Sequence, residues 1–84
     1  MWFVYILKCS DNTLYTGITN DLTKRLSCHN EGKASKYTRS RLPVVMMYNE
    51  ESLDRSEASK REFAIKKMTR GNKLKLIGVQ NAKM

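Results

Sequence analysis

The sequence has few cysteines and no long apolar run, and each shortage excludes a class of protein. Cys9 and Cys28 are its only cysteines, and they lack the CxxC spacing of a zinc site. A disulfide framework and a zinc site are therefore not indicated, and we expect two reduced thiols that serve packing. No stretch approaches the roughly 20 apolar residues that a helix needs to cross a membrane.

Residues 1–9 are largely apolar but lack the basic leader and the small-residue cleavage site of a secretory signal. We read them as a strand, and we expect a cytoplasmic protein without a membrane partner. A chain of 84 residues has room for one compact domain. We place that domain at residues 1–80 and expect residues 81–84 to be a frayed tail.

Acidic side chains are scarce relative to basic ones. Eight Asp and Glu residues stand against 16 Lys and Arg residues, which gives a net charge of +8. Such a balance favours a polyanionic partner, nucleic acid above all. A basic surface can equally serve an acidic protein, the ribosome or simple solubility, so charge alone does not decide the function.

Three short segments have the composition of strands. Trp2–Cys9 is rich in aromatic and β-branched residues, and the turn-forming Ser10–Thr13 separates it from a returning strand, Leu14–Ile18. Pro43 precedes a third strand, Val44–Tyr48. Both faces of the first strand are apolar, as in a strand covered on both sides. We predict an α/β domain of the α+β type, with a three-stranded antiparallel sheet flanked by helices.

The first helix is predicted over Asp21–Glu31. Polar residues at Thr19–Asp21 supply capping side chains, and Gly32 is placed to end the helix in the left-handed conformation. The following stretch, Lys33–Arg41, is polar and basic without a clear period. We predict a loop there.

A second helix is predicted to begin at Asp54. Glu57 follows three residues later, as in a capping box, and Gly71 is placed to end the helix. We predict a short closing helix at Lys73–Val79.

Two tyrosines and a glycine lie in the predicted hairpin. An antiparallel pair of strands can bring Tyr5 close to Tyr15, and two tyrosines that fill a core would explain them as well. Gly17 favours the functional interpretation, because a glycine in a short strand often marks the close approach of another backbone or a ligand.

The first helix carries a polar stripe. Asp21, Arg25 and His29 recur at a spacing of four residues, beside the apolar pair Leu22 and Leu26. Taken alone, this spacing favours a solvated helix face with a weak Asp–Arg pair over a catalytic role. His29 is the only histidine, and the ordinary imidazole pKa suits acid–base chemistry near neutrality.

Glu62 lies at the edge of the apolar arc of the second predicted helix. Surrounded by basic residues, it can pair at the surface, as most helical glutamates do. If it faces a cleft instead, it can bind one Mg²⁺ or Mn²⁺ ion as a hard oxygen ligand, with water and phosphate completing the shell.

The order and spacing of these residues resemble the opening of the GIY-YIG endonuclease family. The segments that carry the likeness are Phe3-Val4-Tyr5, Tyr15-Thr16-Gly17, Asp21-Leu22, Lys24-Arg25-Leu26 and His29. Tyr37-Thr38, the strand after Pro43, and Glu62 continue it, so it covers nearly the whole chain and is strongest to the small stand-alone bacterial members. One position differs, since Phe3 stands where the family name has glycine.

The resemblance implies a role for each matching residue. Tyr5 and Tyr15 would line the site and position or activate the attacking water, with Tyr5 as the first choice of base. Arg25 would hold the scissile phosphate, and His29 would assist. Glu62 would anchor one divalent metal ion, Mg²⁺ or Mn²⁺.

The downstream part of the chain departs from the family pattern. Many members carry an asparagine in the site, whereas Leu74 and Ile77 occupy the stretch where it is expected. Asn72 and Asn81 are imperfect substitutes. The departure implies a weakened nuclease or a site completed in another way.

The predicted function is therefore metal-dependent endonuclease cleavage of nucleic acid, with DNA expected first. A catalytically weak or inactive binding module of the same fold is one alternative, and a basic subunit of a larger complex is another. A protein partner that supplies substrate specificity is compatible with all three. The predicted nucleic-acid contacts are Gly17, Lys24, Lys33, Lys36, Tyr37, Arg39 and Arg41, where the Tyr37 ring would stack on an unpaired base.

Overall fold

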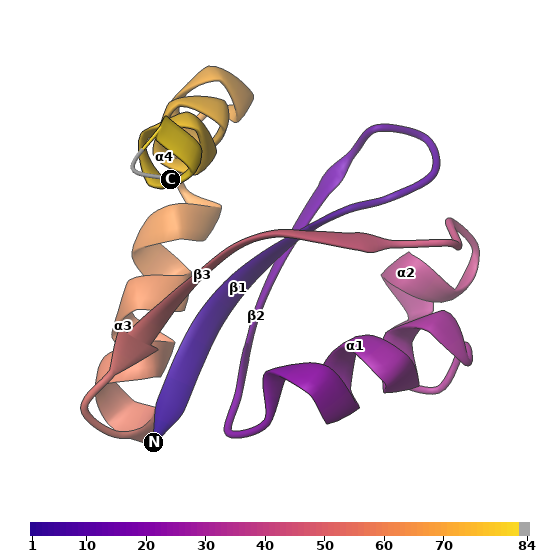
Figure 1. Cartoon of the computed structure of the whole chain (residues 1–84), viewed down its shortest axis with the longest axis horizontal. Helices are drawn as coiled ribbons and strands as arrows, with labels where there is room; N and C mark the ends of the chain where they lie inside the picture. Colours follow the sequence, from indigo (N-terminus) through magenta and orange to yellow (C-terminus); the bar gives the residue numbers. More distant parts are fainter. Residues whose placement is uncertain (83–84) are drawn as a thin grey trace.

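The computed structural model describes the backbone of residues 1–82 and the side chains of residues 1–80 (Figure 1). No helix in this range is long and apolar enough to cross a membrane. The elements in chain order are β1 (Trp2–Lys8), β2 (Leu14–Thr19), α1 (Leu22–Asn30), α2 (Lys36–Arg39), β3 (Val45–Ser52), α3 (Arg55–Lys66) and α4 (Arg70–Ala82).

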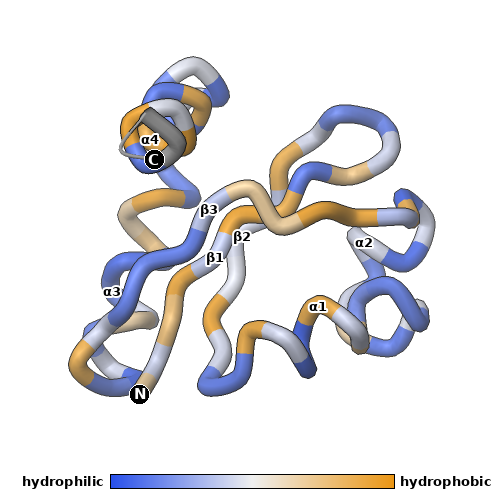
Figure 2. Tube along the Cα trace, viewed as in Figure 1, coloured by the Kyte–Doolittle hydropathy of each residue, from blue (hydrophilic) through white to orange (hydrophobic). Residues whose placement is uncertain are grey.

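The three strands form one antiparallel sheet in the order β2-β1-β3, which confirms the predicted α+β fold. The central strand β1 is buried on both faces. Val4 and Ile6 join one core cluster, whereas Tyr5 and Leu7 join another. Much of the tube along β1 has the colour of hydrophobic residues in Figure 2, in keeping with a strand that is apolar on both faces.

Helices cover both faces of the sheet. In Figure 1, α1 and α2 lie on one side of the strands and α3 and α4 on the other. Leu22 and Leu26 of α1 pack against the Tyr5 cluster, while Ala58 and Ile65 of α3 belong to the Val4 cluster. Both packing interactions depend on the apolar stripes that the sequence places at helical spacing.

Both predicted helix starts are confirmed by their caps. The Asp21 carboxylate accepts a hydrogen bond from the Lys24 backbone N–H at 3.0 Å, and Asp54 accepts from the Glu57 N–H at 2.9 Å. Gly32 follows α1 with a φ of +75°, the left-handed conformation expected of it.

The prediction that Gly71 ends the second helix is wrong. The α3 helix already ends at Lys66, and Gly71 lies inside α4. The Thr69 hydroxyl accepts a hydrogen bond from the Asn72 N–H at 3.2 Å, so a polar cap starts a new helix just before the glycine. The closing helix is therefore longer than the predicted Lys73–Val79.

Three smaller differences complete the comparison. The predicted loop Lys33–Arg41 contains the short helix α2, because the Ser35 hydroxyl caps it by accepting from the Tyr37 N–H at 3.1 Å. The third strand extends to Ser52, where it pairs with Trp2. The α4 helix includes residues 81 and 82 of the predicted tail, and residues 83–84 lie outside the described residues.

Candidate active site

The register of the hairpin sets the position of the two tyrosines. Tyr5 pairs with Gly17 and Leu7 pairs with Tyr15, so these side chains share the sheet face that α1 covers. A Cβ atom placed on Gly17 would lie 2.5 Å from the Tyr5 hydroxyl oxygen. The close neighbour of the buried Gly17 is therefore the Tyr5 side chain, and not the backbone or ligand that the sequence suggested.

His29 holds the hydroxyl of Tyr5. Its side chain is fully buried, with Nε2 2.8 Å from the Tyr5 oxygen and Nδ1 2.8 Å from the Thr38 hydroxyl. The Thr38 hydroxyl donates to the Ser35 carbonyl at 3.4 Å, so it accepts the Nδ1 proton. We assign this tautomer on that basis. It leaves Nε2 as the acceptor of the Tyr5 O–H.

Arg25 reaches the same hydroxyl from α1. Its Nε–H donates to the Tyr5 oxygen at 3.4 Å. Within the described residues Arg25 forms no ion pair, because Asp21 caps the helix instead of forming the surface pair that the spacing allows. Arg25 lines two adjoining hollows of about 220 and 310 Å³. Arg25 thus brings a positive charge to the walls of both hollows.

Burial keeps the proton on Tyr5 in the free protein. It raises the pKa of Tyr5 above the ordinary value, and the Arg25 hydrogen bond offsets only part of that effect. Burial, followed by the positive charge of Arg25, lowers the pKa of His29. Near neutrality the pair is therefore a phenol that donates to a neutral imidazole.

Tyr15 completes the aromatic wall of the site. Its ring meets the His29 ring edge to face, with centroids 5.3 Å apart. The Tyr37 ring stacks on Tyr15 at 5.9 Å, and the Arg41 guanidinium lies 4.0 Å over the Tyr37 ring. Tyr37 is thus engaged within the protein rather than presenting the free stacking surface that the sequence suggested.

Glu62 stands apart from these four residues. It belongs to α3, on the other side of the sheet from α1, and its carboxylate pairs with Lys66 at 3.3 Å. Its charge is nevertheless close enough to contribute to the raised pKa of Tyr5, as the smallest of the causes. Glu62 therefore shares the neighbourhood of Tyr5 without touching the other site residues.

One carboxylate is a sufficient protein ligand for Mg²⁺ when water and phosphate oxygens complete the shell. The Glu62 side chain is 23% exposed, so solvent and a substrate can reach it. Residues 1–82 contain no cluster of three or more acidic, histidine or cysteine side chains that could hold a metal alone. The donor set fits a metal ion that is bound together with a phosphodiester.

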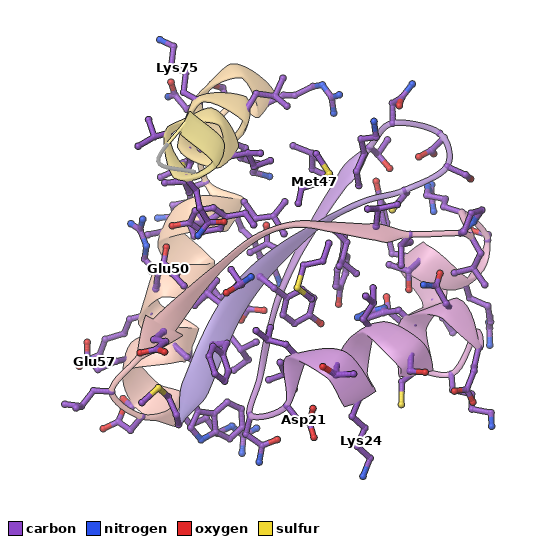
Figure 3. The ribbon with its side chains drawn as sticks, in the orientation of Figure 1. Asp21, Lys24, Met47, Glu50, Glu57 and Lys75 are labelled. Atoms are coloured by element: carbon purple, nitrogen blue, oxygen red, sulfur yellow. The ribbon has the colours of Figure 1, made fainter. Side chains whose placement is uncertain are left out.

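The predicted basic contacts divide into free and engaged side chains. Lys24, Lys36 and Arg39 are exposed, and Figure 3 shows Lys24 on the outer side of α1, pointing away from the sheet. Lys33 is exposed but lies 3.3 Å from Glu31. Arg41 is tied to Asp11 at 3.0 Å.

Two residues that support the site were missed by the sequence interpretation. Thr38 is fully buried and fixes the His29 ring. The side chain of Asn30 donates to the Val44 carbonyl at 3.1 Å and accepts from the Val44 N–H at 2.8 Å, which fastens the end of α1 beside β3. The only signal for Thr38 was its place in the Tyr37-Thr38 segment of the resemblance.

A comparison with protein families matches residues 1–75 to the GIY-YIG catalytic domain. The chain belongs to the GIY-YIG family. Tyr5, Tyr15, Arg25, His29 and Glu62 all lie within the matched range of this GIY-YIG domain.

Its curated relatives are UPF0213 proteins of bacteria. One from Desulfotalea psychrophila is 53% identical over 77 residues, which cover 90% of this chain and 70% of the relative. Another from Clostridium perfringens is 52% identical over 83 residues, which cover 99% and 89%. The names of these relatives state no activity.

Two solved structures share the fold. The NMR structure of a UPF0213 protein from Bacillus halodurans is 36% identical, with a TM-score of 0.60 over 94% of this chain and 85% of that one. An NMR structure from E. faecalis is 39% identical, with a TM-score of 0.63 over 95% and 85%. The GIY-YIG domain described here thus has the arrangement of its relatives.

Proposed function

We propose that this GIY-YIG domain is a metal-dependent endonuclease that hydrolyses phosphodiester bonds in nucleic acid, with DNA as the first candidate substrate. The observation that carries the proposal is the contact set of Tyr5. Its hydroxyl lies between a neutral imidazole that accepts its proton and a guanidinium without a carboxylate partner in the described residues. A core tyrosine requires neither neighbour. We place the enzyme in the cytoplasm, where a protein partner can direct it to substrate.

Arg25 is the residue that binds the scissile phosphate. Its Nε–H bond to Tyr5 holds the side chain in place, while the planar fork of terminal nitrogens can donate to two phosphate oxygens. Because charge on those oxygens grows as the water attacks phosphorus, the guanidinium stabilises the transition state more than the ground state.

Tyr5 and His29 remove the proton of the attacking water. The raised pKa of Tyr5 and the lowered pKa of His29 make a free tyrosinate unfavourable. The water proton therefore passes to the Tyr5 oxygen as the tyrosine proton passes to Nε2 of His29. The phosphorus–O3′ bond breaks in line, and the leaving 3′ oxygen takes a proton from solvent water to become a 3′ hydroxyl, while the proton on His29 returns to solvent after the product leaves. Tyr15 closes the aromatic side of the site.

Access to Tyr5 requires a small movement of Arg25. The tyrosine is 1% exposed, and the Arg25 contact to its hydroxyl is long at 3.4 Å. A phosphate that draws the guanidinium outward uncovers the hydroxyl at the same moment. Substrate binding thus exposes the base, because the residue that covers it is the residue that binds the phosphate.

Glu62 would hold the divalent ion. When bound, such an ion would polarise the phosphate and offset the negative charge of the leaving 3′ oxygen. The Lys66 ammonium, 3.3 Å from the carboxylate, must move aside when the ion binds. This competition predicts weaker metal binding at neutral pH than a carboxylate without that ion pair would show.

The test is cleavage of labelled duplex, flap, junction and single-stranded substrates, with Mg²⁺ or Mn²⁺ and with EDTA. Glu62→Gln should abolish metal-dependent cleavage. Glu57→Gln is the matched control, because Glu57 pairs with Lys60 on the same helix at 3.4 Å. Equal cleavage rates for wild type and Glu62→Gln would refute the metal role, and no cleavage of any substrate would refute the nuclease.

One observation favours a binding module without cleavage. The stretch where the family has its asparagine lies in α4, where Ile77 is buried in the core and Leu74 is exposed. Asn72 lies at the exposed start of the helix. If the asparagine is essential for turnover, the protein binds nucleic acid at Arg25 and cuts it weakly or not at all.

A further inference from the structure

A second hollow adjoins Arg25 and contains none of the other proposed catalytic residues. Its volume is about 310 Å³, and its walls come from the start of β1, the end of β2 with the following turn, and the first residue of α3. The residues that matter here are Trp2, Asn20 and Arg55, together with Arg25 itself.

Trp2 and Arg55 both line this hollow, and their side chains lie against each other. The Arg55 guanidinium carbon lies 5.6 Å from the centre of the Trp2 ring. The other two cation–aromatic contacts are closer, at 4.0 Å for Arg41 on Tyr37 and 4.3 Å for Lys67 on Phe63. The Trp2–Arg55 contact is thus loose, and the exposed Arg55 forms no ion pair within the described residues.

The chemistry of the hollow fits a flat, polar and aromatic ligand. Trp2 packs against the core and is only half-buried, so its indole is a fixed surface that a ring can stack on. Asn20 offers an amide that can both donate and accept at the edge of such a ring. The exposed Arg55 side chain, which now lies over the indole, would swing aside to admit the ring and could then cover it from outside, as guanidinium planes do over nucleobases.

The hollow is continuous with the proposed phosphate site. It shares Thr19, Asn20 and Arg25 with the neighbouring hollow of about 220 Å³, whose wall also includes Lys24. A strand with its scissile phosphate on Arg25 would therefore place an adjacent base beside Trp2 and its next phosphates beside Lys24.

We propose that the Trp2–Arg55 hollow is a subsite for one unpaired nucleobase next to the phosphate that Arg25 binds. The proposal rests on the proposed function in assigning that phosphate to Arg25. A base inside a continuous duplex is stacked and paired, so it cannot enter the hollow. The substrate class is nucleic acid with an unpaired or displaced nucleotide at the cleaved bond, such as a flap, a junction or a single strand.

Trp2 is the only tryptophan of the chain, so its fluorescence reports directly on this subsite. The probe is a short single-stranded oligonucleotide, compared with a blunt duplex of the same sequence in EDTA, where no metal-dependent cleavage occurs. Stacking should quench the indole in a saturable way with the single strand. The same degree of quenching should require an about 10-fold higher concentration of the duplex.

Variants of Trp2 and Arg55 test the subsite, with the affinity for a labelled oligonucleotide measured by fluorescence anisotropy. Trp2→Ala and Arg55→Ala should each weaken single-strand binding about 10-fold, and Trp2→Phe should retain most of it. Phe63→Ala and Lys67→Ala are matched controls, because they remove an exposed aromatic–cation pair outside the hollow. Circular dichroism checks folding, and if Trp2→Ala does not fold, Arg55→Ala and the wild-type quenching decide.

The outcomes separate this subsite from the nuclease itself. Equal quenching by duplex and single strand, or variants that bind like their controls, would overturn the subsite even if the protein cuts. Selective quenching without any cleavage in Mg²⁺ or Mn²⁺ would uphold the subsite and refute the nuclease. Cleavage of flaps and single strands in preference to duplex, lost in Arg55→Ala, supports both.

Discussion

The Tyr5 hydroxyl lies 2.8 Å from Nε2 of His29, although the two residues are 24 positions apart. One comes from the central strand and the other from the last turn of α1. The contact depends on a third element as well, because Thr38 of α2 binds the opposite ring nitrogen. The tertiary fold therefore decides that the Tyr5 hydroxyl donates its hydrogen bond to Nε2 of His29.

Thr38→Val tests whether this orientation matters. The substitution removes the partner of Nδ1 while nearly preserving shape, and a buried group without a partner costs roughly 1–3 kcal/mol of unfolding free energy. We expect kcat to fall about 10-fold, in line with outer partners of functional histidines. Nitrogen-15 NMR of the single imidazole should show the tautomer change. Thr38→Ser keeps the hydroxyl, so it should keep both the kcat and the His29 tautomer of the wild type. An unchanged tautomer in Thr38→Val would contradict the assignment.

Gly17→Ala tests the close packing of the Tyr5 side chain on Gly17 of β2. The new methyl group would lie 2.5 Å from the tyrosine oxygen and 2.7 Å from Cζ, and the hydroxyl is held by His29 and cannot simply turn away. Overpacking of this kind costs roughly 1–3 kcal/mol, and we expect cleavage to be lost with it. Gly78→Ala is the control, since nothing lies within 4 Å there. It should stabilise α4 by about 0.5–1 kcal/mol in a denaturant titration.

Features of the fold that depend on neighbouring residues, such as strand burial and helix caps, were predictable from the sequence. Apolar residues on both faces predicted that β1 is covered on both sides, and the caps at Asp21 and Asp54 identified the starts of α1 and α3. The break between α3 and α4 was not predictable from Gly71, because a glycine is tolerated inside a helix while a threonine cap can start one. A glycine that can end a helix and a threonine that can start one are local signals of similar strength, so the packing of the helices decides where α3 ends and α4 begins.

The sequence nominated candidate site residues without their arrangement. Motif order singled out Tyr5, Tyr15, Arg25, His29 and Glu62; the structure brings Tyr5, Arg25 and His29 into contact, while Glu62 stands apart on α3. Thr38 was hidden, because it lies in a polar stretch without periodicity and gains its role only when α2 docks on α1. The Trp2–Arg55 hollow was hidden for the same reason, since its walls are 53 positions apart in the chain and meet only in the fold.

The pH behaviour of His29 offers a direct measurement on the free protein. Burial and Arg25 lower its pKa, so NMR should give a value below the ordinary 6.5. The unfolded chain then takes up this proton at a higher pH than the folded one. The contribution to stability is complete above about pH 6.5 and is lost as the pH falls from there through the folded pKa. Arg25→Ala should raise the pKa partway, because burial remains, and no change would contradict the proximity of the two charges.

Arg25→Ala should also lower turnover by about 10²-fold or more, as expected when a main contact to the transition-state charge is lost. Binding of the uncleaved substrate should fall much less. Arg70→Ala is the matched control, because Arg70 is an exposed arginine at the start of α4 outside both hollows. Single-turnover cleavage at saturating protein separates the two effects. Equal rates for Arg25→Ala and Arg70→Ala would remove Arg25 from the phosphate site.

The last prediction concerns the basic segment after α1. The net charge of +8 should give an affinity for nucleic acid that falls steeply as salt rises, because bound phosphates release counterions. Charge reversal at Lys33, Lys36 and Arg39 should weaken binding on every sequence alike. Lys36 and Arg39 should carry more of this effect than Lys33, whose ammonium already pairs with Glu31.

Charge reversal at Lys60 is the control for that series. Lys60 is equally exposed and pairs with Glu57, but it lies on α3, which packs on the opposite face of the sheet. Affinity measured from 50 to 300 mM salt should show a slope reduced by roughly one unit for each phosphate contact removed, and no such reduction in the control. If the salt dependence of the affinity is unchanged in the triple variant, the phosphate backbone does not contact α2. Binding would then depend on Arg25 and Lys24.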